Sequence, residues 1–288
     1  MAVALRWTIG DVSARGFAAL RLSVIGARRA FGPEARLAVC VNTIDVATAR
    51  ARAGPVPDGV SWHRSDGEIP GFLRNHLDPG LAEGVAWKFA PMRLFPDDWE
   101  IALDNDCIVW AMPEAVRAWL AGGARTCLLA EDVVPAFGQF TPVCGPAARN
   151  SGIRGLPPGF DLEAALEHML RAHPVQLVSE LDEQGLQVAA LSRCGAPAVV
   201  PVSDVAICSP FPPHAPGLGR CGAHFVGLNV ARPRPYCDAA TLARIAAHWD
   251  GLRAEVERLC GAVPYPPPPA PSRKGRGRRE FPSPCGRG

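Results

Sequence analysis

The chain has 288 residues, of which 48% are hydrophobic, and a formal net charge of +2. This length is enough for one large α/β domain or two small ones. The first residues lack a basic leader followed by an apolar core, and no stretch approaches the ~20 apolar residues that a spanning helix needs. We therefore expect a cytoplasmic protein without a membrane span.

The charge is unevenly distributed along the sequence. Residues 263–288 hold six basic residues and one acidic residue, a net of +5, so residues 1–262 carry −3 of the total of +2. The last segment is also rich in Pro and Gly, a composition typical of a disordered tail. We expect one domain over residues 1–262, mildly acidic and therefore without a nucleic-acid partner. RNA binding by the Arg/Gly-rich tail is an alternative to its reading as a solvated linker.

Ten cysteines are present, but no Cys-x-x-Cys pair. Cys40, Cys107, Cys127 and Cys208 lie within apolar runs. Metal clusters usually need close cysteine pairs, and disulfide scaffolds are usually short secreted chains. The pattern favours reduced thiols buried in the core.

The first elements predict a β-α-β unit. Residues 2–9 form an apolar run, a helix begins at Ser13, and residues 36–42 repeat the strand signal. No Gly-x-Gly-x-x-Gly turn follows the first strand, so a dinucleotide fold is disfavoured. Thr8 and Asp11, at the end of that strand, are candidates for nucleotide contact, although Asp11 equally suits the start of a helix.

Residues 54–80 are rich in Pro and Gly and predict loops around a short strand at Val60–His63. A helix is predicted from Glu83 to Leu94. It contains Lys88, which is either a functional cation or a surface lysine.

The segment from Trp99 to Trp110 predicts a buried strand that ends in two carboxylates. Open α/β sheets bind ligands at the carboxyl ends of their strands. Asp104 and Asp106 would lie there, and paired carboxylates suit a hard divalent cation. The tripeptide alone equally fits a solvated turn, but the buried strand in front of it favours function.

A short helix over residues 113–120 and a strand over 126–130 precede Asn150-Ser151-Gly152. Asn and Ser supply neutral hydrogen-bonding groups and Gly permits close approach, which suits a bound sugar as well as an ordinary turn. Helices are predicted from Asp161 to Arg171 and from Ser179 to Leu191.

Short strands are predicted at residues 198–200 and 205–208, and a long amphipathic helix from Asp238 to Cys260. Between them lies His224. A lone His beside a Phe is more often a core residue than a ligand.

Four motifs together resemble the GT-A glycosyltransferases that use nucleotide sugars, particularly the retaining glycogenin-like and galactosyltransferase-like group. The resemblance covers roughly residues 4–232 and rests on order and spacing. The matching segments are Asp104-Asn105-Asp106, Asn150-Ser151-Gly152, Glu183-Gln184 with Asp182 before it, and His224-Phe225-Val226-Gly227.

The resemblance implies an α/β fold of GT-A type, with a Rossmann-like mixed sheet sandwiched by helices in a single domain. It also implies metal-dependent transfer of a sugar, with retention, from a nucleotide diphosphate donor, UDP favoured, to a glycan, lipid or protein acceptor. Asp104, Asp106 and His224 would hold the metal, and the imidazole favours Mn²⁺ over Mg²⁺. The implied catalytic residues are Asn150, Asp182, Glu183 and Gln184. The implied donor-binding residues are Thr8, Asp11, Lys88, Asn105, Ser151, Gly152 and Gly227.

The sequence departs from the family pattern at three points. Leu228-Asn229-Val230 stands where the family has Lys-Pro-Trp, and the Tyr that often stacks on uracil is missing. Glu183 stands where the family has Asp, so either Asp182 or Glu183 takes that role.

Two other classes compete with this interpretation. Haloacid-dehalogenase-like phosphotransferases also place Asp-x-Asp after an apolar strand, with the first Asp as nucleophile. Their motif normally ends the first strand, whereas about a hundred residues come first here. A non-catalytic carbohydrate- or nucleotide-sugar-binding protein would keep the fold and lose the chemistry.

Overall fold

The computed structural model describes residues 2–65, 69–77, 86–122, 126–229 and 237–262, and the proposed tail at 263–288 lies outside this range. The strands are β1 Val3–Ile9, β2 Arg36–Val41, β3 Val60–Arg64, β4 Trp99–Leu103, β5 Cys107–Val109, β6 Leu128–Glu131, β7 Arg149–Leu156, β8 Ala198–Val200, β9 Val205–Ile207 and β10 Gly222–His224. The α-helices are α1 Ala14–Phe31, α2 Val46–Ala53, α3 Gly71–Arg74, α4 Glu114–Ala121, α5 Thr141–Cys144, α6 Leu162–Ala172, α7 Glu180–Ser192 and α8 Ala239–Cys260. Two short 3₁₀ helices are η1 Ala86–Phe89 and η2 Gly138–Phe140.

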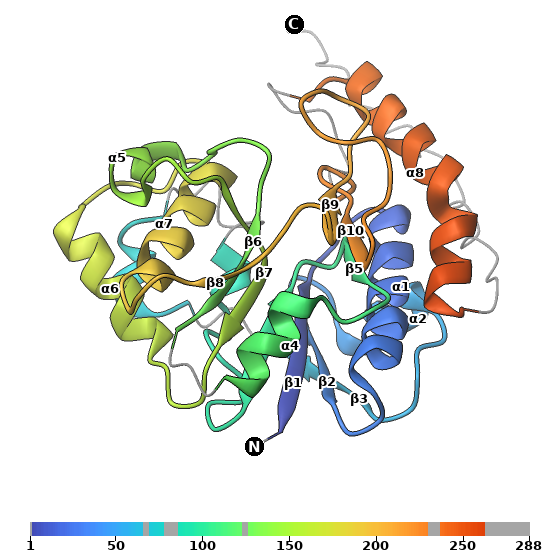
Figure 1. Cartoon of the computed structure of the whole chain (residues 1–288), viewed down its shortest axis with the longest axis horizontal. Helices are drawn as coiled ribbons and strands as arrows, with labels where there is room; N and C mark the ends of the chain where they lie inside the picture. The colour runs from blue at the N-terminus through green and yellow to red at the C-terminus, as the bar shows by residue number, and fades with distance from the viewer. Residues whose placement is uncertain (1, 66–68, 78–85, 123–125, 230–236, 263–288) are drawn as a thin grey trace, which may run out of the picture.

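A seven-stranded mixed sheet in the order β3-β2-β1-β4-β7-β6-β8 forms the centre of the molecule. β7 runs antiparallel to β4 and β6, whereas the other neighbouring pairs are parallel. Figure 1 shows helices on both sides of this sheet, with α6 and α7 on one side and α1 and α2 on the other. The mixed sheet sandwiched by helices confirms the predicted fold class, and β1-α1-β2 confirms the opening β-α-β unit.

Alternation along the strands explains the two layers. In β1, Leu5, Trp7 and Ile9 belong to the hydrophobic cluster that also contains residues of α1, α2 and α4. The opposite face of the sheet packs against a second hydrophobic cluster, built largely from α6, α7 and η2. Arg6 points to that second face, where its guanidinium binds the carboxylate of Glu100 from β4.

A second, three-stranded sheet in the order β5-β10-β9 stands beyond the carboxyl end of β4. Its buried residues Ile108 and Ala223 pack in one cluster with Leu22 of α1 and Trp249 of α8. Figure 1 shows α8 lying along α1 on the outside of the molecule. The amphipathic pattern of this last helix is thereby explained, because its apolar stripe covers the small sheet and α1.

The helix predicted over Glu83–Leu94 is wrong in type and length. Residues 83–85 lie outside the described range, η1 covers only Ala86–Phe89, and residues 90–94 are not helical. Pro91 explains the early end, because it lacks a backbone N–H and its ring disfavours helical geometry at the preceding residue.

Asn150 to Gly155 form most of β7 and not a turn. Gly155 is required by packing, since a Cβ there would lie 2.7 Å from both Leu128 Cβ and a ring carbon of Trp119. The sequence also gave no prediction for α2, although Asp45 caps its first turn by accepting from Thr48 N.

The four cysteines predicted to be buried thiols are free and buried in the structure. Among the helices that the structure describes, none combines the length and apolar character needed to cross a membrane.

Candidate metal and donor site

The two carboxylates of the Asp-x-Asp motif lie on the turn that joins the two sheets. β4 ends at Leu103, and the turn closes when Cys107 N donates to Asp104 O at 2.9 Å. Asp104 N also donates to Gly152 O at 2.9 Å, which ties the turn to β7. The motif therefore follows the fourth strand of the sheet at its carboxyl end, as the sequence predicted.

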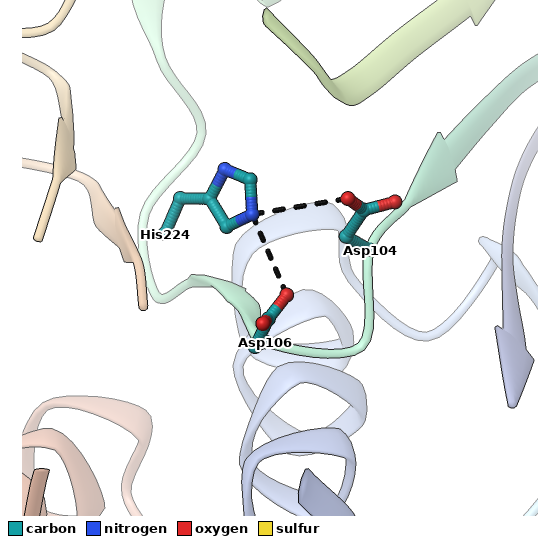
Figure 2. A group of neighbouring side chains, drawn as sticks. All are labelled: Asp104, Asp106 and His224. Carbon is teal, nitrogen blue, oxygen red and sulfur yellow. Dashed lines mark ion pairs between the residues drawn. The ribbon is translucent and has the colours of Figure 1, made fainter. Parts of the chain in front are cut away.

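His224 reaches the same point from β10. The antiparallel register pairs His224 with Cys107, and Phe225 N donates to Asp106 O at 2.9 Å. The ring atom His224 Nε2 lies 3.4 Å from Asp106 Oδ1 and 3.8 Å from Asp104 Oδ2 (Figure 2). The burial of His224 agrees with a core position, and its proximity to both carboxylates also makes it a candidate metal ligand.

These three side chains fit a divalent cation. Within the described residues, Asp104, Asp106 and His224 form a group whose ligand atoms all lie within 4.8 Å of one another. Two carboxylate oxygens and one imidazole nitrogen are a donor set that Mn²⁺ accepts. A single-sided set of this kind leaves the remaining coordination positions to water and substrate oxygens.

Gly152 makes room for the imidazole. A Cβ at this position would lie 2.4 Å from Cε1 and 2.6 Å from Nδ1 of His224, distances that a side chain cannot occupy. Gly152 N donates to Asn150 Oδ1 at 2.7 Å, and Asn150 Nδ2 donates to Asp132 Oδ2 at 2.8 Å. The Asn-Ser-Gly motif therefore shapes the wall of the site through its backbone, and Asp132 holds the amide of Asn150.

Lys88 lies between two carboxylates. Its Nζ is 2.9 Å from Asp104 Oδ2 and 3.4 Å from Glu183 Oε2. Burial alone would lower the pKa of Lys88, but these carboxylates raise it above its ordinary value. The ammonium is therefore fully charged at neutral pH, and 29% of its side chain is exposed.

Behind Glu183 stand two polar residues that the sequence did not single out. Gln187 Nε2 donates to Glu183 Oε1, and Arg154 Nη1 donates to Gln187 Oε1. All three are buried. Burial raises the pKa of Glu183, while Lys88 and Arg154 act in the opposite direction. The spacing of Glu183 and Gln187 by one helical turn is the signal that could have linked them.

Asp182 and Gln184 point in different directions from Glu183. Both carboxylate oxygens of Asp182 are engaged, because it accepts from Gln139 N at 2.8 Å and from Val178 N at 2.9 Å. Gln184 lies nearer the motif of β7, since its Oε1 accepts from Ser151 N at 3.3 Å.

The two nucleotide candidates, Thr8 in β1 and Asp11 just after it, make separate contacts. Asp11 is exposed and paired with Arg52, whose Nη1 lies 2.6 Å from Asp11 Oδ1. Thr8 Oγ1 accepts from Arg6 Nη1 at 3.4 Å on the second face of the sheet. Gly227, with φ of +84°, turns the chain after β10.

Asn229 was missed as a site residue, although it lies where the family pattern is broken. It exchanges two amide hydrogen bonds with Asn105, at 2.7 and 2.9 Å, and its Nδ2 also donates to Asp106 Oδ2 at 3.0 Å. Asn105 in turn donates to Gly16 O at 3.1 Å. The Asn105–Asn229 pair thus fastens the Asp-x-Asp turn to α1 and supports one candidate metal ligand.

The charges at the site lower the pKa of Asp104 and raise that of His224. Burial favours the neutral carboxyl of Asp104, but Lys88 and His224 hold the pKa of Asp104 below its ordinary value. Burial favours neutral His224, yet the hydrogen bond and charge of Asp106, together with Asp104, raise the pKa of His224. The carboxylates of Asp104 and Asp106 therefore attract positive charge to this point, and Lys88 already supplies part of it.

No family model and no curated protein matches the chain. Solved structures do match. The galactosyltransferase LgtC, in complex with donor and acceptor sugar analogues, aligns with a TM-score of 0.55 and 13% identity over 91% of this chain and 97% of that chain. An active-site mutant of LgtC gives 0.53 and 12% over 86% and 95%. The bifunctional glycosyltransferase WbbM gives 0.52 and 15% over 90% of this chain and 51% of that chain. The chain therefore has the fold of the GT-A glycosyltransferases.

Proposed function

We propose that this protein is a metal-dependent glycosyltransferase that moves a sugar from a nucleotide diphosphate donor to an acceptor. The observation that carries the proposal is the convergence of Asp104, Asp106 and His224 at the carboxyl end of β4. Ligands of open α/β sheets bind at this edge. The GT-A fold of the chain supports the same conclusion, because the solved structures that share it are named as glycosyltransferases.

The chemistry of glycosyl transfer explains why carboxylates, an imidazole and an ammonium would be needed at this site. Breaking the bond between the anomeric carbon and a diphosphate places negative charge on the leaving phosphate. A divalent ion held by Asp104, Asp106 and His224 would supply Lewis-acid stabilisation of that charge. The ammonium of Lys88, next to this triad, adds a second positive charge for the phosphates.

We assign the acidic role in the Glu183-Gln184 segment to Glu183 rather than to Asp182. Glu183 faces Lys88, which itself contacts Asp104, so its carboxylate adjoins the metal group. Asp182 is occupied by donors from Gln139 and Val178. Asn150, Ser151, Gly152 and Gln184 form the adjoining wall, where a donor sugar would meet amide groups.

Several finer features belong to the same proposal. UDP is the favoured donor nucleotide, Mn²⁺ the favoured ion, and retention the favoured stereochemistry, because the motifs resemble the retaining group. The acceptor is a glycan, lipid or protein, and a cytoplasmic location agrees with the composition. Thr8, Asp11, Asn105 and Gly227 remain candidates for donor contact.

A thermal-shift screen tests the proposal. Nucleoside diphosphates and nucleotide sugars are each added with and without Mn²⁺, since a ligand that binds the folded state raises its apparent stability. We expect a shift that needs both the metal and a uridine nucleotide. A shift with phosphate mimics and Mg²⁺ alone would favour a phosphotransferase, although the motif here follows β4 and not β1.

Turnover is then measured as hydrolysis or transfer of the sugar from the donor that the screen identifies. Asp104→Asn and Asp106→Asn are expected to abolish it. The matched control is Asp250→Asn, which removes only an exposed pair with Arg15. Full activity in either variant of the motif would refute the proposal. Binding without any turnover in the wild type would identify a non-catalytic nucleotide-sugar-binding protein.

A further inference from the structure

One carboxylate oxygen at the candidate site contacts the ammonium of Lys88 and also borders the position where a metal ion would bind. Asp104 Oδ2 lies 2.9 Å from Lys88 Nζ and 3.8 Å from His224 Nε2, the ring nitrogen that completes the metal group. A divalent ion held between Asp104 and His224 would draw on the same carboxylate that the ammonium uses. Two positive charges this close repel each other unless further negative charge lies between or beside them.

We propose that Lys88 is a built-in competitor of the metal, and that a diphosphate relieves this competition by accepting the ammonium. The inference rests on the proposed function and goes beyond it. In the protein without donor, Lys88 neutralises Asp104 and lowers the affinity for the ion. When the donor's diphosphate binds, its oxygens provide Lys88 with a new partner and leave Asp104 to the metal.

Glu183 makes this exchange possible. Its carboxylate is fixed from behind by Gln187 and Arg154, so it stays in place as one anchor for the ammonium at 3.4 Å. Lys88 has a flexible stem, and its side chain is 29% exposed, whereas that of Glu183 is 2% exposed. The lysine can therefore swing towards an incoming phosphate, while its buried partner keeps it within reach of the site.

The consequence is reciprocal coupling between metal and diphosphate. If the diphosphate tightens the binding of the ion by some factor, the ion tightens the binding of the diphosphate by the same factor. The site would then bind the metal weakly on its own and firmly as the metal–diphosphate pair. The coupling comes from contacts within the chain and adds to any direct bond between metal and phosphate.

The test is a titration of the full chain with Mn²⁺ alone. The electron paramagnetic resonance spectrum distinguishes free from protein-bound ion and so measures the affinity. Wild type is compared with Lys88→Met, which keeps the length of the side chain and removes its charge. We expect the variant to bind Mn²⁺ about tenfold more tightly, within the range typical of coupled sites. Lys88→Arg is the matched control that keeps the charge, and its affinity should stay close to that of wild type.

A second titration adds inorganic pyrophosphate with free Mn²⁺ held by a metal buffer. Pyrophosphate should raise the Mn²⁺ affinity of wild type by a larger factor than that of Lys88→Met. Weaker or unchanged binding of Mn²⁺ alone by Lys88→Met, in a variant that keeps its circular dichroism spectrum, would overturn the inference. That result leaves the proposed function intact. Failure of wild type to bind Mn²⁺ under either condition would overturn both.

Discussion

The carboxylate of Asp182 is enclosed by hydrogen-bond donors from two other segments of the chain. Burial alone would raise the pKa of Asp182, but the bonds from Gln139 and Val178 hold it below its ordinary value. A group with a lowered pKa in the folded state stabilises the fold above its unfolded pKa, and this stability is lost as the pH falls through the folded pKa.

We therefore predict that Asp182→Asn lowers the free energy of unfolding at pH 7 by about 1–3 kcal/mol, because donors lose a charged acceptor. The deficit relative to wild type should shrink as the pH drops below about 4. Chemical denaturation across this pH range measures both effects. Since Asp182 is not among the metal ligands, the Mn²⁺ response should survive, and its loss in a folded variant would return Asp182 to the site.

Asn229 supports a candidate metal ligand, because its side-chain amide donates to Asp106. We predict that Asn229→Leu lowers Mn²⁺ affinity by roughly 10–100-fold, the usual effect of losing a residue that orients a ligand. Asp106 would lose a donor, and Asn105 would lose its partner. Asn75→Leu, at an exposed position after α3, is the matched control. Equal metal affinity in the two variants would show that Asp106 does not need this support.

At this scale, the sequence predicted which residues meet at the candidate metal group but not what surrounds them. Asp104 and Asp106 were expected at the end of a buried strand, whereas His224 was placed with them only by the resemblance of its His-x-x-Gly segment. Asn229 could not be assigned a partner, because it bonds to a residue more than a hundred positions earlier. Arg154 could not be assigned its partner either, because its contact with Gln187 depends on how α7 packs on β7.

Among the elements, β7 leaves space for the His224 ring because one of its residues is a glycine, Gly152. We predict that Gly152→Ala displaces the His224 ring, because the new Cβ would lie 2.4 Å from it. Mn²⁺ binding should fall to the level of His224→Ala. Gly217→Ala, where a Cβ meets nothing within 4 Å, should bind the ion as wild type does. Unimpaired binding by Gly152→Ala would mean that the ring has room to retreat.

The elements that the sequence predicted well are those with a long periodic pattern. α1, α7 and α8 extend over several turns, and β1 and β4 are largely apolar and buried. α2 was missed because it buries only Ala49 and Ala53 and therefore shows no clear apolar periodicity. Asn150-Ser151-Gly152 was interpreted as a possible turn because small polar residues favour turns, whereas pairing with β4 and β6 makes it a strand.

Across the whole molecule, one buried ion pair joins β1, β4 and the segment that follows η1. Arg6 Nε lies 2.6 Å from Glu100 Oε1, and the other oxygen of Glu100 accepts from Leu94 N at 2.9 Å. Their side chains are 2% and 0% exposed. This pair lies under the sheet face that also carries Arg154.

We predict that Arg6→Met lowers the free energy of unfolding by up to about 3–5 kcal/mol, because Glu100 loses its close partner and keeps only Arg93, whose Nε lies 3.9 Å from Glu100 Oε2. The double variant Arg6→Met with Glu100→Gln should recover part of this loss, since the fully buried carboxylate is then replaced by a neutral amide, although Arg93 also loses its ion pair with Glu100. Urea denaturation of wild type, the two single variants and the double variant measures the coupling between Arg6 and Glu100. A double variant less stable than the sum of the single losses would contradict the explanation.

The pairing of β10 with β5 has a consequence for how the protein is made. Asp104 and Asp106 leave the ribosome with the first half of the chain, and β1, β2 and β4 can already form parallel pairs around them. His224 follows only after most of the domain has been synthesised, and it reaches the carboxylates by completing the small sheet. A nascent chain that stops before β10 would hold both carboxylates without His224, so the candidate three-residue group is complete only once translation of the domain is nearly finished.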